Sequence, residues 1–319
     1  MNISDLILKL FGWLSISLVV AFLIDNVMIV GFNFPGAFSI FSNFSLEGLL
    51  EFLIYIIIAS ITFFIVRKSN SNFRSNSQLL HNLNIYLIRS FFWIILITGL
   101  VDIAIAFMRV EKIFEFFLGK EISSNFSRPV FVGMYFHIPL IILGFIIAKF
   151  TRTIGFHWLS LLIVASELLI VITRFVFSYE QTFMGDLVRY WYAGLFLFAS
   201  AYTLYEDGHV RVDIIYQGLK EKTKNLVNCF GSILLGWSTS VVIILLCFYG
   251  KQSIVNSPVA NFEVTQQGSV GMFIKYHMAV FLAIFGITML IQFISYFFES
   301  IADYKNEKGK RIIETSTSH

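Results

Sequence analysis

One continuous stretch near the middle of the chain indicates the class of fold. Residues 188–204 read VRYWYAGLFLFASAYTL, and residues 207–213 follow closely with DGHVRVD. An α-helix needs about 20 apolar residues to cross the hydrocarbon core of a bilayer, which is roughly 30 Å thick. The polar heptapeptide must then lie at the membrane surface or inside a protein contact. The stretch predicts a membrane helix with a dense polar segment at its end.

The rest of the chain has the same character. Of its 319 residues, 57% are hydrophobic and only 13% are charged, whereas soluble domains carry about 25% charged residues. The apolar runs are continuous rather than alternating, which argues against a strand-built barrel. We therefore predict an all-α polytopic helical membrane protein with about eight transmembrane helices. The eight runs are approximately Phe11–Val30, Leu49–Val66, Leu87–Met108, Val130–Phe150, Ile154–Val176, Leu187–Leu204, Leu226–Tyr249 and Gly271–Phe298.

Orientation and organisation follow from the polar segments. Most lysines and arginines fall on one side if the N-terminus is cytoplasmic, although the loop 109–128 is an exception, so both termini are predicted to be cytoplasmic. Residues 1–153 would form a four-helix region with an exposed polar connection at Arg67–Asn84. Residues 154–305 would form a second four-helix region. Residues 306–319 would form a flexible cytoplasmic tail.

After His209 the pattern becomes amphipathic, because apolar residues such as Val210 and Ile214 alternate with charged ones such as Lys220. Such a segment fits a helix lying in the headgroup plane. An ordinary cytoplasmic loop with positive charge is the alternative.

The polar heptapeptide contains the first candidate site residues, Asp207, Gly208, His209, Arg211 and Asp213. An arginine between two acids can pair with a carboxylate through two hydrogen bonds, and either aspartate can cap a helix start. We predict a structural clasp that fixes the sixth helix, with direct contact to a partner subunit as the alternative. Replacing Arg211 by alanine should lower complex assembly before it alters substrate affinity.

Ionisable groups within the apolar runs form a second set. Each costs at least about 2.5 kcal/mol in a membrane helix and needs a partner. Glu167 lies deepest, and we favour a structural pairing with a neighbouring helix or subunit over a proton or cation relay. Asp25 and Asp102 should lie toward outer helix ends, within reach of water or Arg109. Trp93, Asp102 and Arg109 recur in spacing as Trp158, Glu167 and Arg174.

Arg174, Asp186 and Arg189 should lie together near the outer face. The structural interpretation is an ion-pair cluster that orders the loop Ser178–Asp186. The functional alternative is a docking site for a binding protein. His137 and His277 are predicted to lie at the same depth in the membrane. Neither helix, however, carries the second histidine that would be needed to bind two stacked haems. No cofactor and no metal are therefore predicted. Motifs for nucleotides, nucleophilic catalysis or nucleic acids are absent from the sequence.

Several features of the second half occur together. They are Arg174-Phe175, Asp186, the stretch FLFASAYTLYEDGHVRVDIIY at 196–216, Ser253–Ser257, Gly271, Ile274-Lys275 and Gln292. With these residues, Trp158–Ile301 resembles the small membrane subunit of tripartite ATP-independent periplasmic (TRAP) transporters, most closely the mannitol/chloroaromatic subgroup. Asp186 stands where that family usually has glutamate. Residues 1–153 have no counterpart in the resemblance.

The resemblance implies a non-enzymatic scaffold in a bacterial inner membrane. A periplasmic binding protein would deliver an organic acid or related solute. A large membrane subunit would carry the transport site and the sodium coupling, and this chain would brace that subunit. No substrate site is implied here, so the candidate residues, Lys275 included, are structural or interface residues. The alternatives are a membrane redox enzyme or haem protein, and an autonomous transporter.

Overall fold

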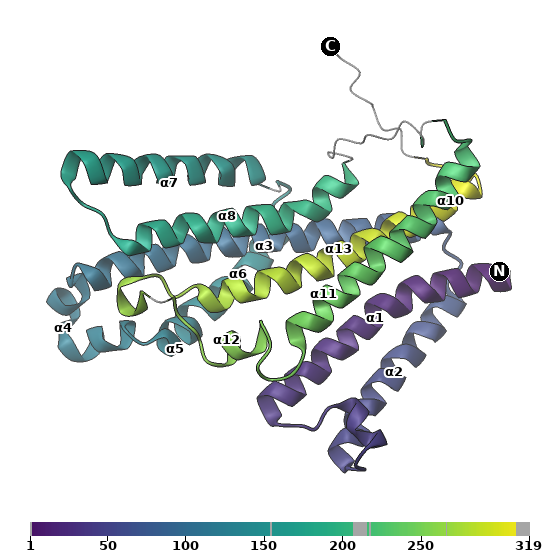
Figure 1. The fold of residues 1–319 in the computed structure, drawn as a ribbon, viewed down its shortest axis with the longest axis horizontal. Coiled ribbons are helices and arrows are strands. Elements are labelled where there is room, and N and C mark those ends of the chain that lie inside the picture. Colours follow the sequence, from purple (N-terminus) through teal and green to yellow (C-terminus); the bar gives the residue numbers. More distant parts are fainter. Residues whose placement is uncertain (1, 154, 207–215, 217, 266, 311–319) are drawn as a thin grey trace. The chain divides into compact units, whose positions relative to one another are not determined.

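The computed structural model describes residues 2–153, 155–206, 216, 218–265 and 267–310 (Figure 1). These residues form helices and connections, without a strand among them. The helices are α1 (Ile3–Phe32), η1 (Ala37–Phe41), α2 (Leu46–Lys68), α3 (Phe73–Val110), α4 (Ile113–Phe126), α5 (Pro129–Val132), η2 (Gly133–His137), α6 (Ile138–Phe150), α7 (Phe156–Phe177), α8 (Thr182–Tyr205), α10 (Glu221–Gly231), η3 (Ser232–Trp237), α11 (Ser238–Phe248), α12 (Asn256–Ala260), η4 (Gly268–Val270) and α13 (Lys275–Tyr304).

Seven helical stretches in the described part are long and apolar enough to cross a membrane, which confirms the predicted all-α polytopic fold. They correspond to all of the expected runs except Leu187–Leu204. The seven stretches are Ile3–Phe32, Leu46–Lys68, Phe73–Val110, Pro129–Phe150, Phe156–Phe177, Glu221–Phe248 and Lys275–Tyr304.

The sixth expected run, Leu187–Leu204, forms most of α8, which is not among the seven. This helix carries Asp186 and Arg189 and the aromatic triplet at 190–192. Protein covers it heavily, and its Tyr190 and Trp191 are buried. Polar groups of membrane proteins face the protein interior, so a covered helix can be less apolar than one that faces lipid.

Local signals set several helix ends. The Ser45 side chain accepts a hydrogen bond from the backbone N–H of Gly48 at 3.0 Å and so caps the start of α2. α1 ends at Phe32, and the next residue, Asn33, has a left-handed backbone (φ 60°) and donates its N–H to the Met28 carbonyl. Pro129 occupies the first turn of α5, where its missing N–H costs nothing.

The chain divides into two compact units, which we treat separately. Each unit takes helices from both of the regions predicted at 1–153 and 154–305. Unit 1 comprises Met1–Leu83, Thr203–Lys251 and Met289–His319, and unit 2 comprises Asn84–Tyr202 and Gln252–Thr288.

In unit 1, the polar connection predicted at 67–84 is mostly helix, because α3 begins at Phe73. The predicted connection is exposed only in part: Arg67 and Lys68 are exposed, whereas Arg74 is buried and pairs with Glu299 at 3.5 Å and with Asp303 on α13. Glu307 accepts hydrogen bonds from the first N–H groups of α3, where a carboxylate is favoured. The polar residues are therefore contact residues, and the described start of the predicted flexible tail is docked.

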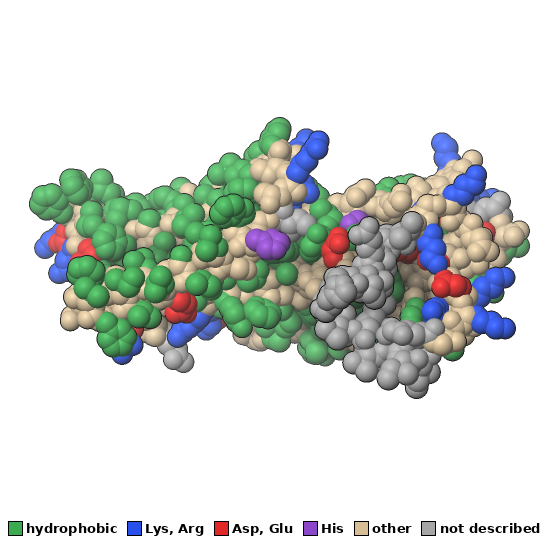
Figure 2. Space-filling view, turned by 90° about the horizontal axis from the view of Figure 1, so that it is seen from above, with side chains coloured by type: hydrophobic (Ala, Val, Ile, Leu, Met, Phe, Trp, Pro, Cys, Tyr) green, Lys and Arg blue, Asp and Glu red, His purple; other side chains and the backbone are tan. Residues whose placement is uncertain are grey.

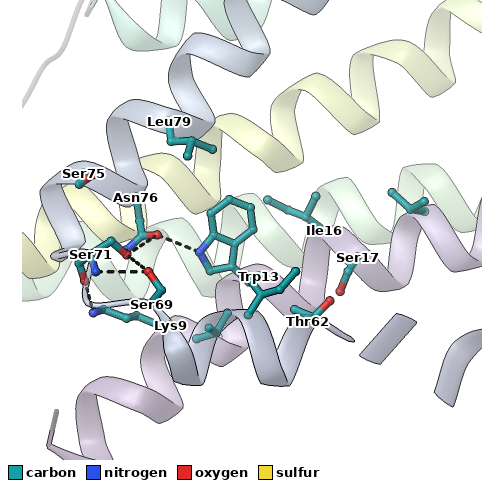
Figure 3. Close-up of a pocket in the computed structure, with 13 residues that line it drawn as sticks. Lys9, Trp13, Ile16, Ser17, Thr62, Ser69, Ser71, Ser75, Asn76 and Leu79 are labelled. Carbon is teal, nitrogen blue, oxygen red and sulfur yellow. Dashed lines mark hydrogen bonds between the residues drawn. The ribbon is translucent and has the colours of Figure 1, made fainter. Parts of the chain in front are cut away.

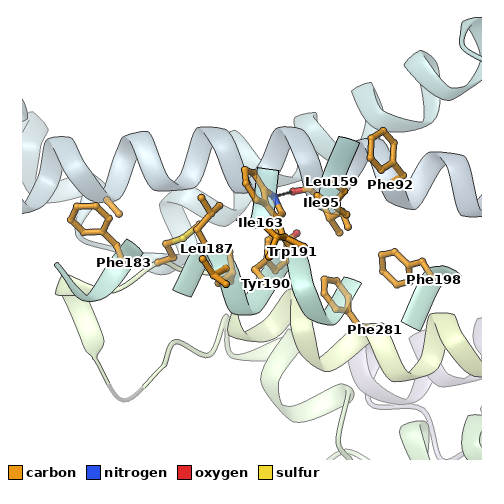
Figure 4. Close-up of a cluster of buried hydrophobic side chains, with 14 residues drawn as sticks. Phe92, Ile95, Leu159, Ile163, Phe183, Leu187, Tyr190, Trp191, Phe198 and Phe281 are labelled. Carbon is orange, nitrogen blue, oxygen red and sulfur yellow. Dashed lines mark hydrogen bonds between the residues drawn. The ribbon is translucent and has the colours of Figure 1, made fainter. Parts of the chain in front are cut away.

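In unit 2, α8 lies in a core of large side chains from α3, α7 and α13 (Figure 4). Trp191 is buried, and its indole N–H donates to the Ile95 carbonyl of α3 at 3.0 Å. Gly99 permits this approach, since a Cβ there would strike the Trp191 ring. The buried members of the core are Phe92, Ile95, Ala106, Leu159, Ile163, Phe183, Leu187, Val188, Tyr190, Trp191, Phe198, Met272, Ile274 and Phe281.

Hydrophobic side chains also cover much of the outer surface, as the visible face in Figure 2 shows. Large apolar residues are widely exposed, among them Phe64, Phe116 and Phe175. Extensive exposed apolar area marks a surface that lipid or another protein covers. The surface thus supports a multi-pass membrane protein.

Candidate functional site

The segment that leads into α13 is held by two buried carboxylates of unit 2. Asp186 Oδ2 accepts a hydrogen bond from the Met272 backbone N–H at 3.1 Å, and Asp102 Oδ2 accepts one from Phe273 N–H at 2.8 Å. Asp186 is 2% exposed and Asp102 is fully buried. Non-helical backbone inside a membrane protein requires such internal partners. The expectation that water reaches Asp102 is therefore wrong, and its hydrogen-bond donor is a backbone N–H rather than Arg109.

Arg109 binds backbone carbonyl groups of the same segment. Its guanidinium donates to the carbonyls of Ser269 at 2.7 Å and Gly271 at 2.5 Å, and it also donates to Phe126 at 3.2 Å. It stacks over the Phe273 ring, 4.0 Å from the centroid, an arrangement that adds cation–π attraction. Arg109 is thus a clamp residue, a role that its sequence position alone did not indicate.

Gly271 allows the segment to lie this close to Asp186. A Cβ at that position would lie 2.7 Å from Asp186 Oδ2 and 3.0 Å from Thr265 Oγ1. We call Asp102, Arg109, Asp186 and residues 269–273 the clamp. The clamp joins side chains of α3, which belongs to the predicted N-terminal region, to backbone of the second region.

Two histidines continue the polar cluster from the clamp. Asp102 Oδ1 lies 3.3 Å from His137 Nε2, and His137 Nδ1 is hydrogen-bonded to the Tyr276 hydroxyl. The Tyr190 hydroxyl oxygen and His277 Nδ1 lie 3.0 Å apart, within hydrogen-bonding distance. The two histidine rings touch, with centroids 4.9 Å apart. His137 sits in the π-helical turn η2, an irregularity that frequently marks functional sites.

Beside the clamp, an open pocket of about 470 Å³ brings together three of the predicted residues, Asp186, Arg189 and Lys275. Arg189 lies 3.7 Å from Asp186, and Lys275 pairs with Glu263 at 2.9 Å. Both basic side chains are well exposed, at 71% and 44%. The pocket therefore has two exposed basic side chains at its rim, each beside a carboxylate.

Arg174 does not join this group. Its ion-pair partner among the described residues is Glu180, at 3.2 Å, and both side chains are exposed. The loop after α7 is anchored instead by Tyr179, whose hydroxyl donates to Glu111 at 2.8 Å. Burial, and then the bond to that carboxylate, raise the pKa of Tyr179 to about 12. The loop is ordered by polar contacts, although not by the single cluster that the sequence predicted.

Glu167 is exposed on α7 and has no hydrogen bond or ion pair among the described residues. The apolar side chains around it are exposed as well: Val164 is 64% and Leu168 is 58% exposed. Only a narrow stripe of α7, which includes Leu159 and Ile163, is buried. Glu167 is thus a carboxylate on an uncovered face of an apolar helix. Asp102 and Glu167 occupy matching positions in the repeated Trp, acid and Arg spacing, but their environments differ.

A further pocket, of about 420 Å³, lies in unit 1 between α1, α2 and the start of α3 (Figure 3). Trp13 donates to Asn76 at 3.0 Å, and Lys9 donates to the Ser71 carbonyl. These hydrogen bonds join α1 to the start of α3 at the polar end of the pocket, whereas Ile16 and Leu79 line its apolar part. The pocket explains why a lysine is tolerated inside α1.

The heptapeptide candidates, Asp207, Gly208, His209, Arg211 and Asp213, lie outside the described residues, as does most of the amphipathic segment. Their predicted roles stay predictions. Within the described part, no group of three or more His, Cys, Asp or Glu residues could hold a metal ion.

Comparison with known proteins agrees with the resemblance. Residues 163–303 match the family described as tripartite ATP-independent periplasmic transporters, DctQ component. No curated protein and no solved structure matched the chain. The matched region includes Glu167, Asp186, the clamp backbone and most of α13, while Asp102, Arg109 and His137 precede it. Residues 163–303 therefore belong to the DctQ family, the small membrane subunit of TRAP transporters.

Proposed function

We propose that the chain braces the large membrane subunit of a TRAP transporter in a bacterial inner membrane, with both termini cytoplasmic. The family works with a large membrane subunit and a periplasmic binding protein. In this proposal the large subunit moves the solute, an organic acid or related small molecule, and couples its uptake to sodium. The chain itself binds no cofactor and catalyses no reaction.

The main support for this proposal is the exposed face of α7 around Glu167. A carboxylate that faced lipid would cost about 2.5 kcal/mol or more, and Glu167 has no partner among the described residues. A basic or hydrogen-bonding group on another membrane subunit would remove that cost. The exposed apolar residues around Glu167 would supply the packing that drives helix association in membranes. We therefore assign the face around Val164, Glu167 and Leu168 to the large subunit.

Residues before the matched region enlarge this scaffold. In unit 2, Asp102 and Arg109 hold the backbone that leads into α13, and in unit 1 Arg74 pairs with acids on α13. The four-helix region predicted at 1–153 thus supports a helix of the family region in both units. Its role in the proposal is to position α13.

The pocket beside the clamp is assigned to the binding protein. Arg189 and Lys275 are exposed side chains at its rim. An acidic patch on a periplasmic protein would be steered to them, with an association rate that falls as salt rises.

The test uses Glu167→Ala in the full chain, purified by a tag from cells that also express the large subunit. Loss of a hydrogen bond to a charged group costs about 1.5–3 kcal/mol, which is roughly a tenfold or greater loss of affinity. Recovery of the large subunit should fall accordingly. Glu115→Ala, which removes an exposed glutamate on α4 that pairs with Lys120, is the control and should behave as wild type.

Equal recovery of the large subunit with Glu167→Ala and wild type would contradict the assignment of α7. Reconstitution of the purified chain alone addresses the alternatives. Liposomes that contain only this chain should show no solute uptake, and the protein should show no visible absorption band. Uptake by the lone chain would support an autonomous transporter, and a haem spectrum would support a redox protein.

A further inference from the structure

The hairpin of α1 and α2 in unit 1 contains two buried carboxyl groups. Asp25 on α1 is 4% exposed, and Glu51 on α2 is fully buried. Both lie in helices that can cross a membrane, outside the family region at 163–303. Among the described residues, no lysine, arginine or histidine forms an ion pair with either. Ionisable groups in such helices are costly and generally mark a function.

Neutral donors hold one oxygen of each carboxyl group. The Tyr55 hydroxyl donates to Asp25 Oδ2 at 3.0 Å, and the Gly36 backbone N–H donates to Glu51 Oε2 at 2.8 Å. Tyr55 follows Glu51 by one helical turn, so both side chains share the face of α2 that meets Asp25. The bond from Tyr55 therefore brings the Asp25 carboxyl to the part of α2 that carries Glu51. The hairpin thus places the two groups opposite each other.

The two remaining oxygens, Asp25 Oδ1 and Glu51 Oε1, are buried and lack a hydrogen-bond partner in the described structure. An ionised carboxylate can only accept hydrogen bonds. Two ionised groups at this place would repel each other and leave both oxygens unsatisfied. A single proton between them turns one group into a donor and satisfies both oxygens at once. One negative charge then remains, shared with the Tyr55 and Gly36 donors.

We propose that Asp25 and Glu51 form a proton-binding site that holds one shared proton within the membrane hairpin. The site is separate from the bracing role, because it uses neither α7 nor the clamp. The titratable groups near it are Tyr55 and Glu47, both on α2. η1 and the connection 33–36 contain no titratable side chain. α11, which contacts α1 through Phe248, contains no acidic or basic residue.

Infrared spectroscopy of the purified full chain tests the site directly. Wild type should show the C=O stretching band of a protonated carboxyl group at neutral pH. Because the pair shares one proton, either Glu51→Gln or Asp25→Asn should remove the same band component. Glu47→Gln, which changes an exposed glutamate one turn away on α2, should keep it. Absence of the component in wild type, or its survival in either variant, would overturn the proposal.

Thermal unfolding provides an independent readout. Raising the pH removes the shared proton and leaves two buried negative charges facing each other, so the wild-type midpoint should fall. Glu51→Gln, with an amide that donates to Asp25, should keep its midpoint over the same range, and Glu47→Gln should follow wild type. Sodium chloride and choline chloride distinguish a proton from a sodium ion. If sodium chloride alone raises the wild-type midpoint, and neither salt raises the midpoint of Glu51→Gln, the pair is a sodium site and the proposal of a shared proton is overturned.

Discussion

Asp102 contributes to the clamp through one hydrogen bond that no other group replaces. Asp102→Ala leaves the buried Phe273 N–H without its acceptor, and an unsatisfied buried group costs about 1–3 kcal/mol. The free energy of unfolding in detergent should fall by that amount. Asp102→Asn retains an acceptor oxygen and should cost less. Equal losses for both variants would mean that the charge near His137, and not the bond to Phe273, is what matters.

Gly271 offers a second test at the same place. A Cβ there would press on Asp186 and Thr265, and overpacking of this kind costs about 1–3 kcal/mol. Gly271→Ala should lower the thermal midpoint of the purified protein. Gly185→Ala on α8 is the matched control, because a Cβ at Gly185 meets no atom within 4 Å. If both variants unfold at the wild-type temperature, the segment is less closely held than the clamp geometry implies.

Some of these residues could be predicted from sequence and some could not. Glu167 and Asp186 were recognisable as acids in apolar surroundings, because the cost of such groups depends only on their type and the solvent. Their environments depend on which helices meet. Asp102 and Glu167 occupy the same place in a repeated spacing, yet one is fully buried and the other is exposed.

Among the elements, α3 differs most from its prediction. Hydropathy located its apolar part correctly, since lipid contact requires apolar side chains. The sequence predicts an exposed connection for its first turns because they contain Arg74, Asn76 and Ser77. Arg74 and Ser77 meet matching groups of α13, because Ser77 lies 3.1 Å from Ser295 and Arg74 pairs with two acids. Asn76 instead accepts a hydrogen bond from Trp13 on α1. Hydropathy cannot distinguish water from a polar protein partner.

The ion pairs of Arg74 give the prediction at the level of this helix. The Arg74 side chain is 6% exposed, and those of Glu299 and Asp303 are 15% exposed. Removing one partner of a buried pair typically costs about 3–5 kcal/mol, so Arg74→Ala should destabilise the protein strongly. Arg67→Ala, at the exposed end of α2, should change stability by less than about 0.5 kcal/mol. Similar unfolding midpoints for the two variants would show that Arg74 is solvated rather than paired.

For the whole molecule, apolar runs and polar segments predicted a division at residue 153, whereas the compact units cut across it. The sequence could not show this, because the division depends on which helices pack together. α3 and α13 each contribute residues to both units. The contacts of Arg74, Asp102 and Arg109 with residues after 154 make the two predicted regions interdependent within each unit.

This interdependence predicts the behaviour of a divided chain. Residues 154–319 expressed alone should fail to yield a folded protein, because Met289–Tyr304 would lose Arg74 and the segment 269–273 would lose Asp102 and Arg109. Co-expression of 1–153 with 154–319 as separate polypeptides should restore a complex, since the clamp and the Arg74 pairs need no covalent link. Size-exclusion chromatography after purification through a tag on one fragment would measure this. Adding Asp102→Ala and Arg74→Ala to the first fragment should abolish the co-purification, whereas Glu115→Ala should not. A stable, monodisperse 154–319 fragment would show that the family region folds without the preceding helices, and the assignment of those helices to positioning α13 would then fail.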